Sequence, residues 1–231
     1  GAYFTFETEE GEQVEVQMGV SFVSIENARL NLEKEQPFGT TFDKLRAEAR
    51  KKWNDDLSRI KVEGGTEEQK GVFYTAMYHT MVHPNILQDV SGQYPQMEGD
   101  KILTTNRNRY TVFSLWDTYR NYHQLMTLVY PERQMDMIHT MMGMYKEHGW
   151  FPKWELYGDP SIPVLVDSWM KGLQDFDIDE AYKGMYKSAT TPGKDNLMRP
   201  DNDDYMSKGY VPMESQYDNS VSHALEYYVA D

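Results

Sequence analysis

Residues 41–60, with the sequence TFDKLRAEARKKWNDDLSRI, decide the fold class because apolar residues recur there with a helical period. The opposite face carries Lys, Arg, Glu and Asp, as in a helix that buries one side. The apolar positions are Phe42, Leu45, Ala49, Trp53, Leu57 and Ile60. Gly64 and Gly65 then end the helix. Segments of the same kind follow, so we expect a mainly α-helical domain over residues 41–231.

The later helices carry their own start and stop signals. Thr66 and Gln69 have the spacing of a capping box, and Pro131 and Gly149 bound another helix. Further helices are expected from Ser114 to about residue 129, from Asp159 to about 176, from Asp179 to about 189, and from about Asn219 to Asp231. The intervening residues 85–110, 149–158 and 190–213 are predicted to be loops. Alternating short turns and long loops favour a helical toroid whose long loops build the site.

The N-terminal residues have a different pattern. Residues 1–25 alternate apolar and polar side chains around a Glu-Glu-Gly turn, which predicts a β-hairpin. A lone hairpin is barely stable in water, so these strands are expected to belong to a larger sheet. Residues 26–40 are predicted to be a linker that ends at Pro37 and Gly39.

Composition excludes several classes of protein. The formal charge of −14 and the absence of a clustered basic face argue against a nucleic-acid partner. With no cysteine, the chain has neither disulfides nor thiolate chemistry. No window approaches the roughly 18 apolar residues of a transmembrane segment. The chain opens on Gly1 without a leader-like segment, so we expect a processed or partial chain.

Residues 114–123, SLWDTYRNYH, are the first candidate site because a carboxylate, a guanidinium, an imidazole and aromatic rings fall together. Trp and Tyr faces beside Asp and Arg suit a sugar, which offers apolar C–H patches ringed by hydroxyls. The alternative is structural: Ser114 and Asp117 also have capping-box spacing, with Trp116 in the core. Arg120, one turn on, is expected to pair with Asp117.

Trp154 and Glu155 form a second candidate, a sugar platform with a carboxylate in a Gly-bounded loop. The alternative is a loop packed on its own aromatic residues. His79 and His83 have the spacing of two zinc ligands, but no third ligand is indicated. Residues 201–204 lack the Gly and Glu of a calcium loop and are predicted to be a solvated polar loop.

Several segments together resemble glycoside hydrolase family 92, the calcium-dependent exo-acting α-mannosidases. The matching segments are GVSFVS (19–24) with Glu26-Asn27-Ala28, FYTAMYH (73–79), FSLWDTYR (113–120), VYPER (129–133), PVLVD (163–167), Lys171-Gly172 and SVSHALEY (220–227). The resemblance covers nearly the whole chain. It departs from the family at residues 157–160, where a longer link is expected.

The resemblance implies an N-terminal β-sandwich, ending in residues 1–25, followed by an (α/α)6 barrel of which residues 41–231 form the first part. It implies inverting hydrolysis of a terminal α-mannoside by a carboxylic acid and a carboxylate base. Asp117 would bind the terminal mannose with Trp116 nearby, and Trp154 and Glu155 would line the site. The family's Glu-Gly-Asn-x-Trp acid motif and Gly-Asn-Asp-Asp-x-Gly base motif do not occur here and are expected beyond Asp231. Calcium ligands are expected there too.

The preferred hypothesis is therefore part of an α-mannosidase that acts on α-1,2-linked ends of mannan or N-glycans, with a mannose-containing glycan as partner. A periplasmic, outer-membrane-attached or secreted location goes with that function. Two alternatives stay open: a non-catalytic carbohydrate-binding toroid, and another toroid sugar enzyme such as a lyase or an epimerase.

Overall fold

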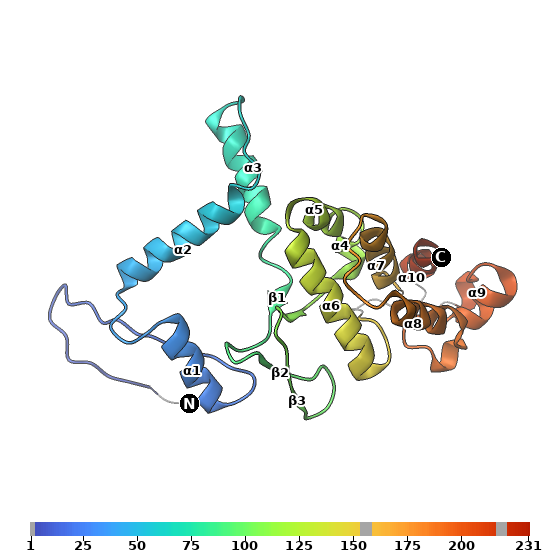
Figure 1. Ribbon diagram of the computed structural model, residues 1–231, viewed down its shortest axis with the longest axis horizontal. Coiled ribbons are helices and arrows are strands. Elements are labelled where there is room, and N and C mark those ends of the chain that lie inside the picture. The colour runs from blue at the N-terminus through green and yellow to red at the C-terminus, as the bar shows by residue number, and fades with distance from the viewer. Residues whose placement is uncertain (1–2, 153–158, 216–220) are drawn as a thin grey trace.

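The structure, a computed structural model, describes residues 3–152, 159–215 and 221–231. Over these ranges the chain is mainly helical with a few short strands, as predicted. The elements are α1 (Ile25–Glu35), α2 (Phe42–Leu57), α3 (Glu67–His79), β1 (Asn85–Ile86), β2 (Gln93–Pro95), β3 (Ile102–Thr104), β4 (Tyr110–Thr111), α4 (Leu115–Thr118), α5 (Tyr122–Val129), α6 (Pro131–His148), α7 (Ser161–Met170), α8 (Ile178–Thr190), α9 (Asn202–Lys208) and α10 (Val221–Ala230). Figure 1 shows helices α4 to α8 gathered together, here called the packed region, and α1 to α3 as an open frame beside them, here called the open region.

Helix α6 is the centre of the packed region. Pro131 occupies its first turn, and Gly149, at φ 83°, ends it in the left-handed conformation, as the sequence predicts. Its buried side chains are Gln134, Met135, Met137, Ile138, Thr140, Met141, Met142 and Met144. The methionines and Ile138 among them join one apolar cluster with Leu115 of α4 and Leu165 of α7. Each fully buried aliphatic side chain contributes about 1.5–3 kcal/mol, so this cluster stabilises the packed region.

The single helix predicted from Ser114 to about residue 129 is wrong. The structure has two helices, α4 and α5, separated by residues 119–121. Asn121, at φ −147° and ψ −28°, lies outside the helical range and breaks the run. The Trp-Asp-Thr segment consequently sits on a four-residue helix of its own.

The open region contains the helices predicted from residues 41 and 66. The capping box is confirmed: the Gln69 backbone donates to Thr66 Oγ1 at 3.2 Å, and the Thr66 backbone donates to Gln69 Oε1 at 2.9 Å. Helix α2, however, has no buried residue within the described chain, and Phe42 is 65% exposed. The Trp53 and Tyr78 rings, 4.7 Å apart between centroids, join α2 to α3.

The hairpin predicted for residues 1–25 is not formed over the part of it that is described, because residues 3–23 carry no strand. Residues 26–40, predicted to be a linker, contain most of α1. Ser24 caps this helix by accepting from the Asn27 backbone. The buried residues of α1 are Asn27 and Asn31 rather than apolar ones, so the helix has no apolar stripe that could reveal it.

Asn27 and Asn31 fasten α1 to the segment before β2. Their amide groups donate to the two carboxylate oxygens of Asp89 at 2.8 and 2.7 Å, and Ser21 Oγ donates to the same carboxylate at 2.6 Å. Asp89 is 7% exposed, so these bonds compensate the loss of its hydration.

Residues 85–110 are not the unstructured loop that the sequence predicts. Strand β1 pairs antiparallel with β4, and β2 pairs antiparallel with β3. Strands of two or three residues are too short to show a period of two. Arg109 anchors the segment to α6, since its guanidinium donates to Glu147 at 3.0 Å and to the Thr140 carbonyl at 3.1 Å.

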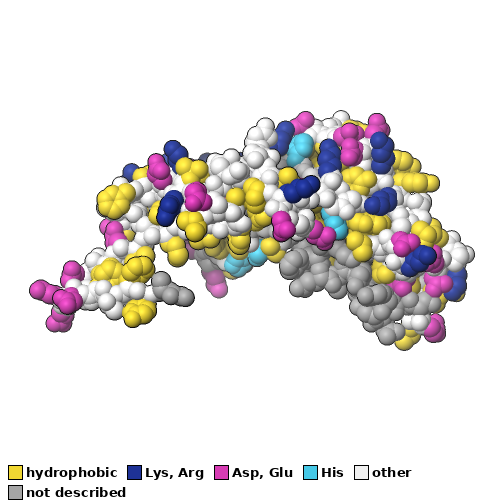
Figure 2. Space-filling model, turned by 90° about the horizontal axis from the view of Figure 1, so that it is seen from below, with side chains coloured by type: hydrophobic (Ala, Val, Ile, Leu, Met, Phe, Trp, Pro, Cys, Tyr) yellow, Lys and Arg dark blue, Asp and Glu magenta, His cyan; other side chains and the backbone are white. Residues whose placement is uncertain are grey.

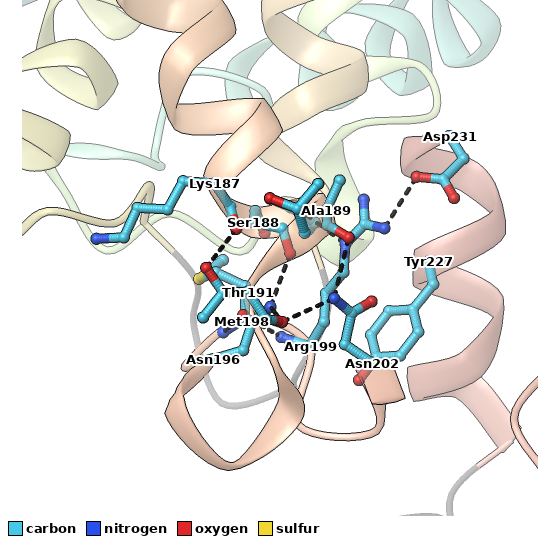
Figure 3. Close-up of polar contacts among 12 residues, drawn as sticks. Lys187, Ser188, Ala189, Thr191, Asn196, Met198, Arg199, Asn202, Tyr227 and Asp231 are labelled. Atoms are coloured by element: carbon cyan, nitrogen blue, oxygen red, sulfur yellow. Dashed lines mark hydrogen bonds and ion pairs between the residues drawn. The ribbon is translucent and has the colours of Figure 1, made fainter. Parts of the chain in front are cut away.

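Residues 190–213, predicted as a polar loop, contain α9 and 3-10 turns at Gly193–Asp195 and Met213–Ser215. Buried polar side chains hold the segment to α8 (Figure 3): Asn196 Nδ2 donates to the Ser188 carbonyl at 2.7 Å, and Asn202 Nδ2 to the Ala189 carbonyl at 3.0 Å. Residues 201–204 are therefore not a solvated loop, because Asn202 is fully buried and begins α9.

The surface is elongated and exposes apolar side chains among acidic and basic ones (Figure 2). Along the N-terminal segment these exposed apolar residues are Tyr3, Phe4, Phe6, Val14, Val16, Met18, Val20 and Phe22. Among the described residues, no helix combines the length and apolar character needed to cross a bilayer.

Candidate functional site

The turn that begins α4 presents the Asp117 carboxylate. The Ser114 carbonyl accepts from the Asp117 and Thr118 backbone N–H groups, both at 3.1 Å. Ser114 Oγ donates to Asp117 Oδ2 at 2.5 Å, and Ser114 makes no side-chain cap to the backbone. In a capping box Asp117 would accept from a backbone N–H instead. The capping interpretation is therefore wrong: Asp117 is an exposed carboxylate with one oxygen held by a hydroxyl.

The sequence predicts an ion pair between Arg120 and Asp117, and the structure does not contain it. The Arg120 guanidinium carbon lies 4.8 Å from the centre of the Trp116 ring and 5.4 Å from that of Tyr119. The two rings are 5.7 Å apart and tilted by 37°. A cation over aromatic faces is stabilised by the ring quadrupole. The exposed Arg120 is thus held beside Asp117 by aromatic contacts, and within the described chain it forms no ion pair.

A pocket of about 180 Å³ lies beneath this turn. Its lining residues are His83, Pro84, Val112, Phe113, Ser114, Thr118, Tyr122 and His123. Val112, at φ 62°, is the one non-glycine residue with positive φ among the described residues. A β-branched side chain rarely adopts this conformation, and such strain is often found at functional sites.

Polar contacts continue from the turn into the packed region. Thr118 Oγ1 lies 3.2 Å from His123 Nε2, and His123 Nδ1 lies 3.0 Å from the Gln134 amide oxygen. Complete burial lowers the pKa of His123 to about 4, although the Gln134 hydrogen bond and the Asp167 charge act in the opposite direction. The imidazole is therefore neutral at physiological pH. Burial likewise raises the pKa of Tyr122.

Trp154 and Glu155 lie outside the described residues, so their part in the site stays a prediction. The residues on either side of their loop are anchored to α8 and to the C-terminal segments. Lys187 Nζ donates to the Gly149 carbonyl at 2.7 Å and lies 4.1 Å from the centre of the Trp150 ring. Beyond the loop, Asp159 lies 3.4 Å from Arg199 Nε.

Arg199 connects that end of the loop to α10. Its Nη1 donates to Asp231 at 2.9 Å, and the guanidinium lies over the Tyr227 ring (Figure 3). Burial raises the pKa of Asp159, and the nearby Arg199 charge and Ser188 hydroxyl lower it only partly.

The calcium predicted from the family resemblance needs a set of oxygen ligands, usually several carboxylates. Over residues 3–152, 159–215 and 221–231 no three acidic, His or Cys side chains come close enough to hold a metal ion. Asp203 accepts instead from the Gly193 backbone at 3.1 Å, and Asp204 pairs with Lys208 at 2.7 Å. The described side chains therefore do not fit a calcium site, and no chemical step is derived through one.

Comparison with known proteins identifies the family of this chain. The model of the glycosyl hydrolase family 92 catalytic domain matches residues 27–231. The chain belongs to this family. A family 92 inverting mannosidase from Bacteroides thetaiotaomicron superposes with a TM-score of 0.83 at 30% identity, over 91% of this chain and 30% of that one. A family 92 α-mannosidase from the same bacterium, bound to mannoimidazole, gives 0.79 at 33% identity, over 90% of this chain and 27% of that one.

Among curated proteins, an uncharacterized secreted glycosidase from Arthroderma benhamiae is 25% identical over 98% of this chain and 28% of its own length. The chain thus spans under a third of the length of the relatives it matches.

Sequence reasoning missed three features of the site. Ser114 was considered only as a cap, whereas its hydroxyl binds the Asp117 carboxylate. Arg120 follows Trp116 by four residues, and this spacing, which brings side chains together on a helix, could have predicted their contact. The contact between His123 and Gln134 links α5 to α6, and no local pattern in the sequence indicates it.

Proposed function

We propose that this chain is part of an exo-acting α-mannosidase that hydrolyses terminal mannosides with inversion, preferring α-1,2-linked ends of mannan or N-glycans. The family membership and the two structurally similar mannosidases support the reaction class. The observation that carries the proposal is the Asp117 carboxylate, exposed on the α4 turn, with Ser114 holding one oxygen and Trp116 and Arg120 beside it.

In the proposed complex Asp117 accepts hydrogen bonds from hydroxyls of the terminal mannose. A carboxylate offers about four lone-pair sites, and Ser114 uses one of them. Arg120 donates to a neighbouring sugar oxygen while its guanidinium stays against the indole, and the exposed parts of the aromatic residues receive the C–H patches of the sugar. Trp154 and Glu155 add a further wall. Asp117 recognises substrate and transfers no proton.

The proton transfers are assigned to an acid and a base outside this sequence, because the family's two motifs are absent from it. The acid would protonate the leaving oxygen while the base activates water on the opposite side of the sugar. Calcium would be bound outside the described residues. For the location of the enzyme we propose the periplasm, the outer membrane or the medium, and the secreted relative supports export.

The wider architecture is proposed to be an (α/α)6 toroid that begins in residues 41–231 and follows an N-terminal β-sandwich. Two observations support this arrangement. Helix α2 exposes an apolar face, and residues 14–22 expose apolar side chains at every second position, as a strand that pairs with neighbours would.

The test is hydrolysis by the full-length protein of mannobioses with α-1,2, α-1,3 and α-1,6 linkages. Proton NMR of the first turnovers reports the anomer released. We expect the α-1,2 disaccharide to be the best substrate and β-mannose to appear before mutarotation. Release of α-mannose first, or activity on uronates without activity on mannosides, would refute the proposal.

A further inference from the structure

A chain of polar side chains runs from the interior of the packed region to the Asp117 turn. It begins at Ser168 of α7, whose Oγ lies 3.0 Å from the Gln134 amide nitrogen of α6. It continues through His123 of α5 to Thr118 of α4. Thr118 Oγ1 in turn lies 2.9 Å from the Ser114 carbonyl. Ser168, Gln134 and His123 are each at most 1% exposed, so water does not substitute for these contacts.

The contacts of Gln134 fix the position of the proton on His123. His123 is neutral, so only one of its ring nitrogens carries a proton. The Gln134 amide oxygen faces Nδ1, so Nδ1 carries the proton and Nε2 is an acceptor. The Thr118 hydroxyl then shares its proton between two acceptors, His123 Nε2 and the Ser114 carbonyl.

In this arrangement the Gln134 amide nitrogen donates to the Ser168 hydroxyl, and its oxygen accepts from His123. The buried part of the chain of polar side chains is therefore fully hydrogen-bonded, and it ends at the Thr118 hydroxyl.

We propose that His123 and Thr118 are positioning residues, which hold the Ser114 turn and thereby orient the Asp117 carboxylate toward the terminal sugar, with His123 as the Nδ1–H tautomer. The inference rests on the proposed function of Asp117. Helix α4 has four residues and no side-chain cap, and it is separated from α5 at Asn121. So short a helix is not stable by its own backbone bonds, and a tether from the core supplies the missing constraint.

The direct test compares Thr118→Val, which keeps the shape and removes the hydroxyl, with Thr118→Ser, which keeps the hydroxyl, in the full-length enzyme. Loss of one hydrogen bond at a binding site is expected to raise KM for a terminal mannoside about tenfold in Thr118→Val. We expect kcat to stay within about threefold, since substrate binding is the affected step. Thr118→Ser should restore most of the KM.

His139→Gln is the matched control. His139 lies on α6, does not belong to the chain of polar side chains, and contacts the exposed Asp175. The His139→Gln variant should leave KM unchanged even if it lowers the melting temperature. A KM of Thr118→Val equal to that of wild type would overturn the proposal. So would an unrestored KM in Thr118→Ser.

Two further measurements separate this inference from the proposed function. If Asp117→Ala lowers kcat/KM while Thr118→Val does not, only the positioning role fails; if Asp117→Ala is fully active, both fail. Nitrogen-15 NMR of histidine-labelled full-length enzyme, with His123→Gln to assign the signal, needs no Thr118 variant to fold. It should show a protonated Nδ1 and an unprotonated Nε2, and the opposite tautomer would overturn the proposed direction.

Discussion

Helices α2 and α6 differ in what covers them, although both are long and amphipathic. Helix α6 buries Ile138 and Met141 completely in the apolar cluster that it shares with α5 and α7. Helix α2 has no buried residue in the described structure, and its first apolar residue, Phe42, is 65% exposed. The comparison shows that an apolar stripe marks the face a helix can bury, while burial requires a partner in the same structure.

The same contrast locates the candidate site. The Asp117 turn projects from the packed region and is connected to its interior by Thr118 and His123. On α2, by contrast, the Asp55 carboxylate pairs with Lys51 of the same exposed helix. An exposed carboxylate that is supported by the core is suited to binding a ligand. An exposed ion pair within one helix contributes little to the free energy of unfolding.

The largest expected effect comes from truncating the packed helix. Ile138→Ala should reduce the free energy of unfolding by about 2–5 kcal/mol, because it leaves a cavity in a fully buried site. Phe42→Ala in the same 231-residue chain is the control and should change it by less than about 0.5 kcal/mol. Urea unfolding measures both. Equal losses of unfolding free energy in the two variants would mean that α2 is covered by another part of the chain.

The contrast between the two regions also explains which helices the sequence predicts. Helices with clear caps, such as α3 and α6, were predicted because their start and stop signals are local. Helix α1 was missed since its buried side is Asn27 and Asn31, which bind Asp89 far along the chain. In the site, Asp117 and Trp116 could be selected from residue types. The bond from Ser114 to Asp117 and the chain through His123 depend on backbone geometry that no pattern specifies.

A second prediction concerns acid stability of the packed region. The folded-state pKa of His123, about 4, is below its ordinary value of 6.5, so the unfolded chain binds a proton that the folded chain does not. The stability due to the neutral imidazole is fully present above pH 6.5 and is lost as pH falls toward 4. The loss amounts to roughly 3 kcal/mol at most.

The measurement is the free energy of unfolding of wild type and His123→Gln across this pH range. His123→Gln should be less stable at pH 7, and the difference should shrink toward pH 4. Comparing the two proteins cancels the opposite contribution of Asp159, whose pKa is raised. A difference that stays constant with pH would contradict a buried neutral His123.

The smallest expected effect is at Val112, at the edge of the packed region. Its φ of 62° strains a β-branched residue, so Val112→Gly relieves strain. The substitution also removes some packing, and glycine loses more conformational entropy than valine on folding. We expect a stability within about 1 kcal/mol of wild type. Val164→Gly, at a buried valine of α7, is the matched control and should cost several-fold more. Equal losses at both valines would argue that Val112 is unstrained.

In the proposed function Asp117 binds substrate and does not stabilise the fold. Asp117→Ala in the full-length enzyme tests it most directly, with Asp55→Ala, an exposed carboxylate of α2, as control. We expect kcat/KM for the terminal α-mannoside to fall at least about 100-fold, since hydrogen bonds donated by the sugar to a charged carboxylate are lost. The melting temperature should stay within about 2 °C of wild type. A melting temperature lowered as far as in Ile138→Ala, or an unchanged kcat/KM, would contradict the claim.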